Sequence, residues 1–144
     1  MRFKDKRKYT LSRVVGERAI IKQKEGEVDI YTDAKTYRIN RALDNLSEED
    51  YILTGSIKAG TSYILDVPYY KENISNKPWH ERIKILNNEF NWNNSIKFEK
   101  PLVASDKHEF NELVKMYKMS PDTDKIKVKK YNGDYTEKDY TVEV

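Results

Sequence analysis

Two arginines near the start of this 144-residue sequence are candidates for a phosphate-binding pair. Arg13 and Arg18 are five positions apart, so a regular strand would point them to opposite faces. A turn at Gly16 would bring both guanidinium groups to one cleft, where they could bind a phosphate. The alternative interpretation is a pair of surface cations.

A second basic group lies near the end of the chain. Lys125, Lys127 and Lys129 alternate with apolar residues, so on a strand they share one face and form a basic stripe. A basic stripe suits phosphate binding, and Lys127 and Lys129 are the residues we expect to contact a ligand. The alternative is a solvated sheet face that also discourages edge pairing.

The net charge of +3 is unevenly distributed. Residues 1–22 hold eight lysine or arginine residues and two acidic residues. We expect a basic N-terminal arm over residues 1–9 and a single domain over residues 10–144, since no linker or repeat divides the chain. The arm is suited to contacts with nucleic-acid phosphate, or it serves only as a solvated segment.

Several classes of chemistry are disfavoured by composition. The chain has no cysteine, which excludes disulfides, thiolate metal sites and cysteine nucleophiles. Its histidines, His80 and His108, are far apart in the sequence, and the acidic cluster at residues 48–50 is typical of a loop. No apolar run is long enough for a membrane span, and no signal peptide is apparent. We therefore expect a cytoplasmic protein with no metal, no cofactor and no membrane partner.

The elements that must position the basic residues alternate between strands and helices. Helical spacing of apolar residues predicts one helix near residues 79–90, capped by Ser75 or Asn76, and another that is capped by Ser105. A short helix is expected over residues 40–46. Alternating and β-branched segments predict strands over residues 9–15, 19–24, 27–32, 51–58, 62–67, 96–104, 126–131 and 140–144. The pattern indicates an α+β fold with mainly antiparallel sheets.

Five segments, in order along the chain, resemble the adenylation domain of ATP-dependent DNA ligases. Residues 13–21 (RVVGERAII) and 26–31 (GEVDIY) are similar to the first ligase motif and the strand after it. Residues 52–59 (ILTGSIKA) stand where the family has D-G-E-[IL]-V-A, and residues 63–70 (YILDVPYY) resemble the F-D strand that follows. Residues 78–86 (PWHERIKIL) are similar to the family's L-P-L-x-E-R-x-x-L-L helix.

The resemblance implies a minimal, ATP-grasp-like nucleotidyltransferase fold, with antiparallel sheets and packed helices around an ATP cleft. In this family the first step transfers AMP from ATP onto a motif lysine. That step needs a nucleophilic amine, a metal that neutralises the phosphates, and acidic residues that hold ribose and metal.

The sequence departs from the family at the residues that carry this chemistry. Arg13 stands at the position of the nucleophilic lysine, and arginine keeps its proton at physiological pH. Val15 replaces the motif aspartate, while Thr54 and Ser56 replace the two carboxylates of the D-G-E segment. Hydroxyl groups are poor substitutes for carboxylates around a hard cation. The resemblance therefore implies a degenerate domain without catalytic residues.

A few binding residues remain in the family's pattern. Arg18 matches the motif arginine, and Asp66 matches the F-D aspartate, with Leu65 at the position of the stacking aromatic residue. Residues 124–129 resemble E-G-x-V-x-K, in which Lys129 matches the lysine. The residues expected to bind a ligand are Arg13, Arg18, Asp66, Lys127 and Lys129.

Three hypotheses for function follow. The first is a non-enzymatic module that binds nucleic acid or a nucleotide-like ligand. The second is a viral or mobile-element protein that binds and inhibits a host protein, such as a nucleic-acid enzyme or a defence factor. The third is residual enzymatic activity with a different nucleophile. The oligomeric state is left open.

Overall fold

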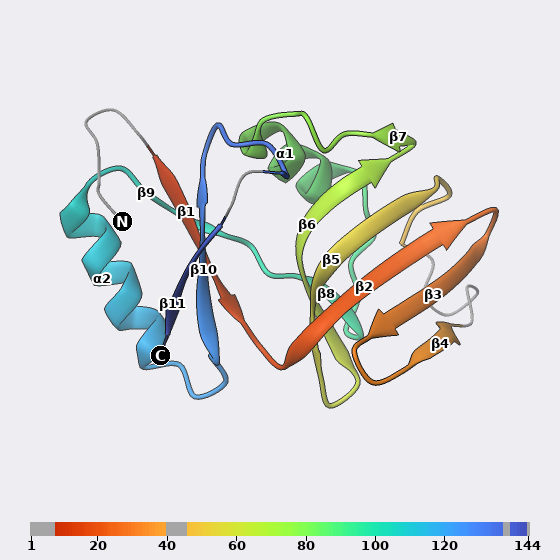
Figure 1. Cartoon of the computed structure of the whole chain (residues 1–144), viewed down its shortest axis with the longest axis horizontal. Coiled ribbons are helices and arrows are strands. Elements are labelled where there is room, and N and C mark those ends of the chain that lie inside the picture. The colour runs from red at the N-terminus through yellow and green to blue at the C-terminus, as the bar shows by residue number, and fades with distance from the viewer. Residues whose placement is uncertain (1–7, 40–45, 137–138, 144) are drawn as a thin grey trace.

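Two β-sheets and two α-helices make up the described part of the chain, which in this computed structural model comprises residues 8–39, 46–136 and 139–143 (Figure 1). Sheet A has the antiparallel strand order β11-β10-β1-β9, with bounds Tyr140–Glu143, Lys125–Lys130, Tyr9–Val14 and Leu102–Ala104. The fold is α+β with mainly antiparallel sheets, so the predicted fold class is confirmed.

Sheet B is the larger sheet and has seven strands. In sheet order, its first six strands are β4 (Thr36–Ile39), β3 (Glu27–Thr32), β2 (Glu17–Lys24), β5 (Tyr51–Lys58), β6 (Thr61–Tyr70) and β7 (Glu72–Asn73). The seventh, β8 (Ile96–Phe98), pairs with β6 in parallel. The sheets lie side by side, with helix α2 (Lys107–Lys118) beside sheet A and helix α1 (Trp79–Asn88) beside β6 (Figure 1).

Each sheet has its own hydrophobic core. In sheet A, Leu11, Ile126 and Val128 are buried against Tyr117 of α2. The larger core of sheet B has the members Ile21, Leu53, Ile64, Val67, Trp79 and Leu86, among others. The helices follow the predicted apolar spacing because these positions face the sheets.

The register of β1 with β10 decides which basic residues can face sheet B. Directly opposed residues in an antiparallel pair point to the same face. Arg13 lies opposite Ile126, whose side chain is in the core beneath α2, so Arg13 points to the α2 side. Lys127 lies opposite Ser12 and therefore points the other way, toward sheet B.

Strands β4 and β7 were not predicted, and the largest differences among the predicted strands are at β6 and at residues 96–104. Strand β6 does not stop before Pro68 but continues to Tyr70. The pairing of β5 and β6 shifts register between Ile52 and Thr54, so Pro68 lies in a bulge where the missing N–H breaks no ladder bond. Residues 96–104 form two short strands, β8 and β9, separated by residues 99–101, in place of one strand.

The helix starts also differ from prediction. Helix α1 is capped by Pro78 without a side-chain hydrogen bond, and neither Ser75 nor Asn76 caps it. Helix α2 is capped by Asp106 in place of Ser105, since the Asp106 carboxylate accepts from the Glu109 N–H. The helix expected over residues 40–46 lies outside the described residues except for Leu46, which is buried.

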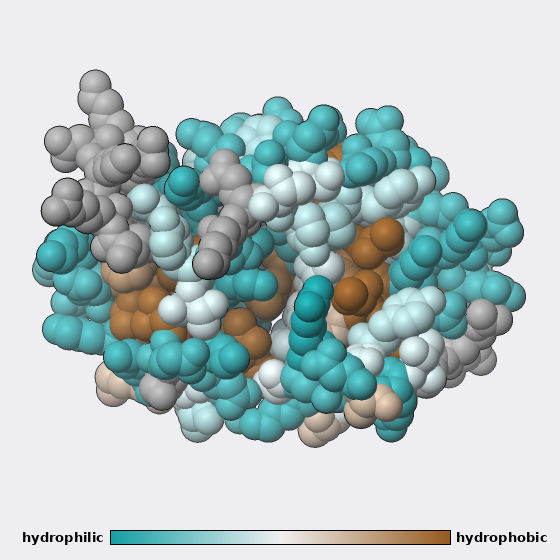
Figure 2. Space-filling model, in the orientation of Figure 1, coloured by the Kyte–Doolittle hydropathy of each residue, from teal (hydrophilic) through white to brown (hydrophobic). Residues whose placement is uncertain are grey.

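The surface is mostly hydrophilic, with hydrophobic side chains visible beside α2 and over part of sheet B (Figure 2). Within the described part of the chain, the large exposed hydrophobic residues are Tyr31, Leu102, Val103, Met116, Met119 and Tyr140. Trp92 is partly buried against the core of sheet B and donates its indole N–H to the Leu86 carbonyl at 2.8 Å. Among the described helices, none combines the length and apolar character needed to cross a membrane.

Candidate functional site

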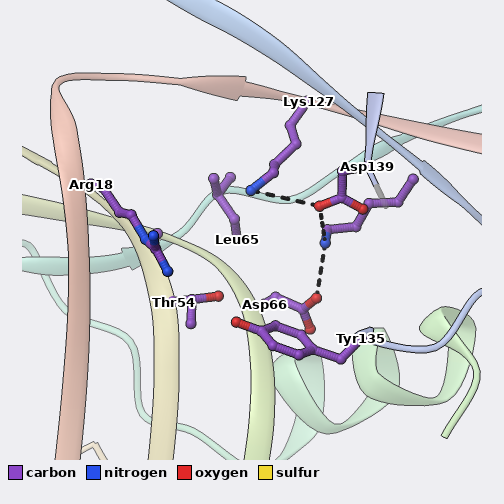
Figure 3. Close-up of a pocket in the computed structure, with 9 residues that line it drawn as sticks. Arg18, Thr54, Leu65, Asp66, Lys127, Tyr135 and Asp139 are labelled. Carbon is purple, nitrogen blue, oxygen red and sulfur yellow. Dashed lines mark hydrogen bonds and ion pairs between the residues drawn. The ribbon is translucent and has the colours of Figure 1, made fainter. Parts of the chain in front are cut away.

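A pocket of about 340 Å³ lies between sheet A and sheet B (Figure 3). Its volume is at the small end of the range typical of small-molecule sites, roughly 300–1,000 Å³. The wall from sheet A comes from β10, and the wall from sheet B comes from β2, β5 and β6. The lining residues are Arg18, Thr54, Gly55, Leu65, Asp66, Lys127, Lys129, Tyr135 and Asp139.

A bulge in β6 shapes the sheet B wall. Thr54 pairs with Asp66, but Gly55 pairs with Ile64, so Leu65 is an extra residue in β6. A bulge redirects side chains locally, and here the consecutive residues Leu65 and Asp66 both line the pocket. A Cβ on Gly55 would lie 2.1 Å from the Tyr63 carbonyl oxygen. The close approach of β5 to β6 beside the pocket therefore requires a glycine.

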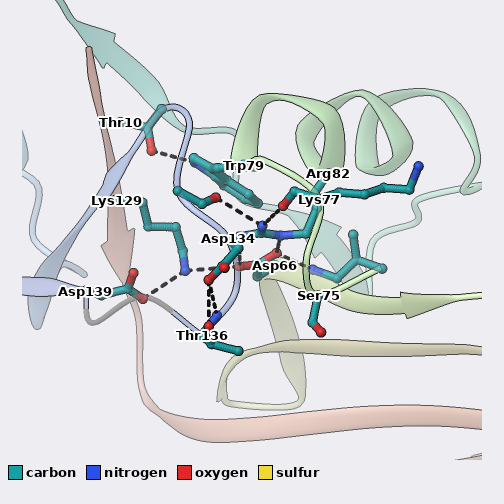
Figure 4. A network of polar contacts seen from close by, with 12 residues as sticks. Thr10, Asp66, Ser75, Lys77, Trp79, Arg82, Lys129, Asp134, Thr136 and Asp139 are labelled. Carbon is teal, nitrogen blue, oxygen red and sulfur yellow. Dashed lines mark hydrogen bonds and ion pairs between the residues drawn. The ribbon is translucent and has the colours of Figure 1, made fainter. Parts of the chain in front are cut away.

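Buried charges form a network at one end of the pocket (Figure 4). Asp66 accepts from Arg82 Nε at 2.9 Å and Nη2 at 3.1 Å, and its Oδ2 is 3.0 Å from Lys129 Nζ. The backbone N–H of Val67 donates to Asp66 Oδ1 at 2.7 Å. The Asp66 side chain is only 3% exposed. A carboxylate this buried needs such partners, because an unpaired buried charge is costly.

Lys129 joins this network to the loop that follows β10. Its ammonium lies 2.8 Å from Asp139 Oδ2 and over the rings of Trp79 and Tyr135, at 5.3 and 5.9 Å from the ring centroids. Burial alone would lower the pKa of Lys129, but the carboxylates of Asp66 and Asp139 outweigh it and raise that pKa. Lys129 is therefore a cation that links β10 to β6 and to the loop.

The opposite end of the pocket has cations with few partners. Arg18 extends from β2, and Lys127 extends toward it from β10 (Figure 3). Among the described residues Arg18 makes no hydrogen bond or ion pair, and Lys127 has a long contact of 3.6 Å with Asp139 Oδ2. Burial and the neighbouring Lys129 lower the pKa of Lys127. These two side chains can bind an anion without first breaking a short ion pair.

Arg13 does not line this pocket. Its Nε donates to Glu99 Oε1 at 2.6 Å, and its guanidinium lies 5.7 Å from the centroid of the Tyr63 ring. The hydrogen bond to Glu99 raises the pKa of the Arg13 guanidinium further. The pairing of β1 with β10 explains this position, because it turns Arg13 to the face covered by α2.

The structure thus brings together Arg18, Asp66, Lys127 and Lys129 of the five predicted ligand-binding residues and leaves Arg13 apart. Whether the four bind a ligand remains a prediction. Lys127 and Arg18 are open to the pocket, whereas Asp66 and Lys129 are engaged with each other.

Sequence reasoning missed Arg82, Tyr135 and Asp139 as parts of the site. Arg82 had a usable signal, since it lies between Trp79 and Leu86 on the apolar side of the predicted helix, and an arginine there requires a buried partner. Asp139 and Tyr135 lie in the loop between β10 and β11, and no periodic pattern marks them.

The described residues contain no group of three or more histidine, aspartate or glutamate side chains arranged to hold a metal ion. Thr54 lines the pocket where the resemblance places a carboxylate, and Asp66 is surrounded by cations. The arrangement can bind an anion, and its donor set is poor for a hard cation.

The arrangement of the two sheets and helices is similar to that of a solved ligase structure. The ligase domain of LigD from M. tuberculosis is similar to this chain, with a TM-score of 0.61 and 12% sequence identity. The similarity covers 90% of this chain and 50% of that chain, so this chain spans about half of that ligase domain. No family model matches the sequence, and no curated protein is significantly similar to it. The chain has a ligase-like nucleotidyltransferase fold.

Proposed function

We propose that this chain is a non-enzymatic module of ligase-like fold, and that it binds nucleic acid or a nucleotide-like ligand through a phosphate. The observation that carries the proposal is the pair Arg18 and Lys127, two cations that face one pocket with little compensation from carboxylates. Asp66 does not offset them, because Arg82 and Lys129 already neutralise it. An anion therefore completes the charge balance of this end of the pocket.

The absence of nucleotide transfer is the second part of the proposal. By resemblance Arg13 stands for the nucleophilic lysine, yet its guanidinium is paired with Glu99 and keeps its proton. Lys129 is held as a cation by two carboxylates, which removes its lone pair as a nucleophile. Lys127 is the lysine in the pocket that a surviving activity would use, because its pKa is lowered.

A salt series tests the binding part. Binding of a fluorescent, 5′-phosphorylated single-stranded DNA is measured by anisotropy at increasing salt. If Arg18 and Lys127 each contact one phosphate, the slope of log affinity against log salt is about −1.4 or steeper. The variant Lys84→Ala, which removes an exposed lysine of α1, is the matched control and keeps the wild-type affinity. A flat series, or no binding to DNA, RNA or nucleotide, contradicts the proposal.

Intact-mass measurement tests the absence of transfer. The protein is incubated with ATP and magnesium, and the mass of the whole chain is recorded. We expect no AMP adduct. An adduct that disappears in Lys127→Arg would identify Lys127 as a relocated nucleophile and overturn the non-enzymatic assignment.

A second candidate function is binding to another protein, in line with a virus-encoded inhibitor of a host factor. It is favoured by the hydrophobic side chains near α2, where Met119 is 84% exposed and Met116 is also exposed. Exposed hydrophobic surface is typical of protein interaction sites. A stoichiometric complex recovered at high salt, and lost in a Met116→Ser/Met119→Ser double variant, would favour this function over phosphate binding.

A further inference from the structure

The carboxylates of the pocket are the groups that would decide whether a phosphate is bound together with a metal ion. The ligase-like fold implies a divalent metal beside the phosphates. Magnesium binds oxygen ligands in near-octahedral geometry, usually through one or two carboxylates together with phosphate oxygens. The question is whether Asp66 and Asp139, the carboxylates that line the pocket, can supply such ligands.

Asp66 has no oxygen left for a metal. Its Oδ1 accepts from Arg82 Nε and from the Val67 N–H, and its Oδ2 is bound by Arg82 Nη2 and Lys129 Nζ. A carboxylate has about four lone-pair positions, and four donors occupy them here. A metal ion would have to displace a buried guanidinium or ammonium, each held by hydrogen bonds of 2.9–3.1 Å.

At Asp139 the obstacle to a metal ion is the positive charge of two neighbouring lysines. Its Oδ2 is 2.8 Å from Lys129 Nζ and 3.6 Å from Lys127 Nζ, so two ammonium groups already face it. Lys129 also stands between Asp139 and Asp66, at ion-pair distance from both (Figure 4). A dication that bridged the two carboxylates would be repelled by this lysine at close range.

We infer that the pocket takes its phosphate group free of metal, with Arg18 and Lys127 in place of a divalent cation as the neutralising charges. This inference rests on the proposed function. It names the ligand class as a phosphate ester or pyrophosphate that enters with its full negative charge. Magnesium then competes with the protein for the ligand, because it neutralises the same phosphate oxygens.

Calorimetric titration of pyrophosphate into the whole chain tests the inference. One series contains EDTA and the other contains excess magnesium, at equal ionic strength. We expect binding in EDTA and a lower apparent affinity in excess magnesium, and an affinity that rises with magnesium would contradict the inference. Lys127→Ala weakens binding in EDTA about tenfold or more, whereas Lys84→Ala leaves it unchanged.

The failures of the two proposals are distinguishable. Binding that requires magnesium and disappears in EDTA overturns metal-free recognition but leaves the phosphate-binding function standing. No binding in either series, with no binding of DNA, RNA or nucleotide, overturns the proposed function and the inference with it. Binding in EDTA that both Lys127→Ala and Arg18→Ala leave intact overturns the assignment of the phosphate to this end of the pocket.

Discussion

Lys127 and Lys129 are two residues apart on one face of β10, yet they belong to different regions of the pocket. The Lys129 side chain is 11% exposed and has two carboxylates within 3.0 Å. The Lys127 side chain is 39% exposed, and its contact with Asp139 is 3.6 Å. Lys129 is therefore structural because two carboxylates surround it, whereas Lys127 is open to a ligand because no carboxylate pairs closely with it.

The charge states of the two lysines follow the same division. Carboxylates outweigh burial at Lys129 and raise its pKa, whereas burial and the charge of Lys129 lower the pKa of Lys127. The network region thus holds its charges whether or not a ligand is present. The positive charge of Lys127 is destabilised by burial and by Lys129. A bound anion would relieve this destabilisation, so the Lys127 region favours anion binding.

The largest expected effect is the loss of stability on neutralising the centre of the network. Asp66→Asn leaves Arg82 buried without a carboxylate partner and leaves Lys129 with Asp139 alone, and it lowers the free energy of unfolding by about 3–5 kcal/mol. Urea denaturation measures the change. Asp139→Asn is the control, since that side chain is 23% exposed, and its cost is about 1 kcal/mol or less. Equal losses of unfolding free energy for the two variants would contradict the assignment of Asp66 to the centre of the network and Asp139 to its edge.

A comparison of the two lysines gives the next largest effect. Lys129→Met removes two charged hydrogen bonds while Arg82 still pairs with Asp66, so the free energy of unfolding falls by about 1.5–3 kcal/mol. Lys127→Met changes it by about 0.5 kcal/mol or less. Thermal or urea unfolding distinguishes the variants, and a larger loss at Lys127 would reverse the assignment of roles.

Affinity for pyrophosphate is expected to show the opposite order. Arg18→Ala and Lys127→Ala each remove a charged hydrogen bond to the phosphate, worth about 1.5 kcal/mol, and so weaken binding roughly tenfold. Their stability changes by about 0.5 kcal/mol or less, because both side chains are partly or fully exposed. Calorimetry together with unfolding of the same samples checks both statements. Unchanged affinity with lowered stability would make these residues structural.

The smallest effect is a dependence of affinity on pH. The pKa of Lys127 is lowered from its ordinary 10.5, so its charge is lost at a lower pH than in an unfolded chain. Affinity for pyrophosphate therefore declines as the pH rises toward the ordinary lysine pKa of 10.5, while Lys127→Arg retains it because arginine stays charged. Fluorescence or calorimetric titrations across this range measure the decline. Identical pH profiles for the two proteins would show that Lys127 is not the titrating group.

Much of the fold could be predicted from local patterns. The alternation in residues 125–130 placed Lys127 and Lys129 correctly on one strand face, and apolar spacing predicted both described helices. Strand ends were harder, because a bulge allows β6 to include Pro68. A bulge depends on which strands pair, and that information is not local in sequence.

The site could be predicted only in part for the same reason. The register of β1 with β10 turns Arg13 away from the pocket, and a one-residue change in that register would reverse it. Asp139 reaches Lys127 and Lys129 through the loop after β10, which no periodicity specifies. The sequence could identify Arg82 as a buried charge. It could not identify Asp66 as its partner, because the two residues meet only through the packing of α1 against β6.

A crystal structure of the protein with pyrophosphate tests the central claim most directly. The expected result is a phosphate group between Arg18 and Lys127, with no metal ion beside it and with the contacts of Asp66 to Arg82 and Lys129 unchanged. A metal ion on Asp66 or Asp139, with Lys129 displaced toward the phosphate, would contradict it.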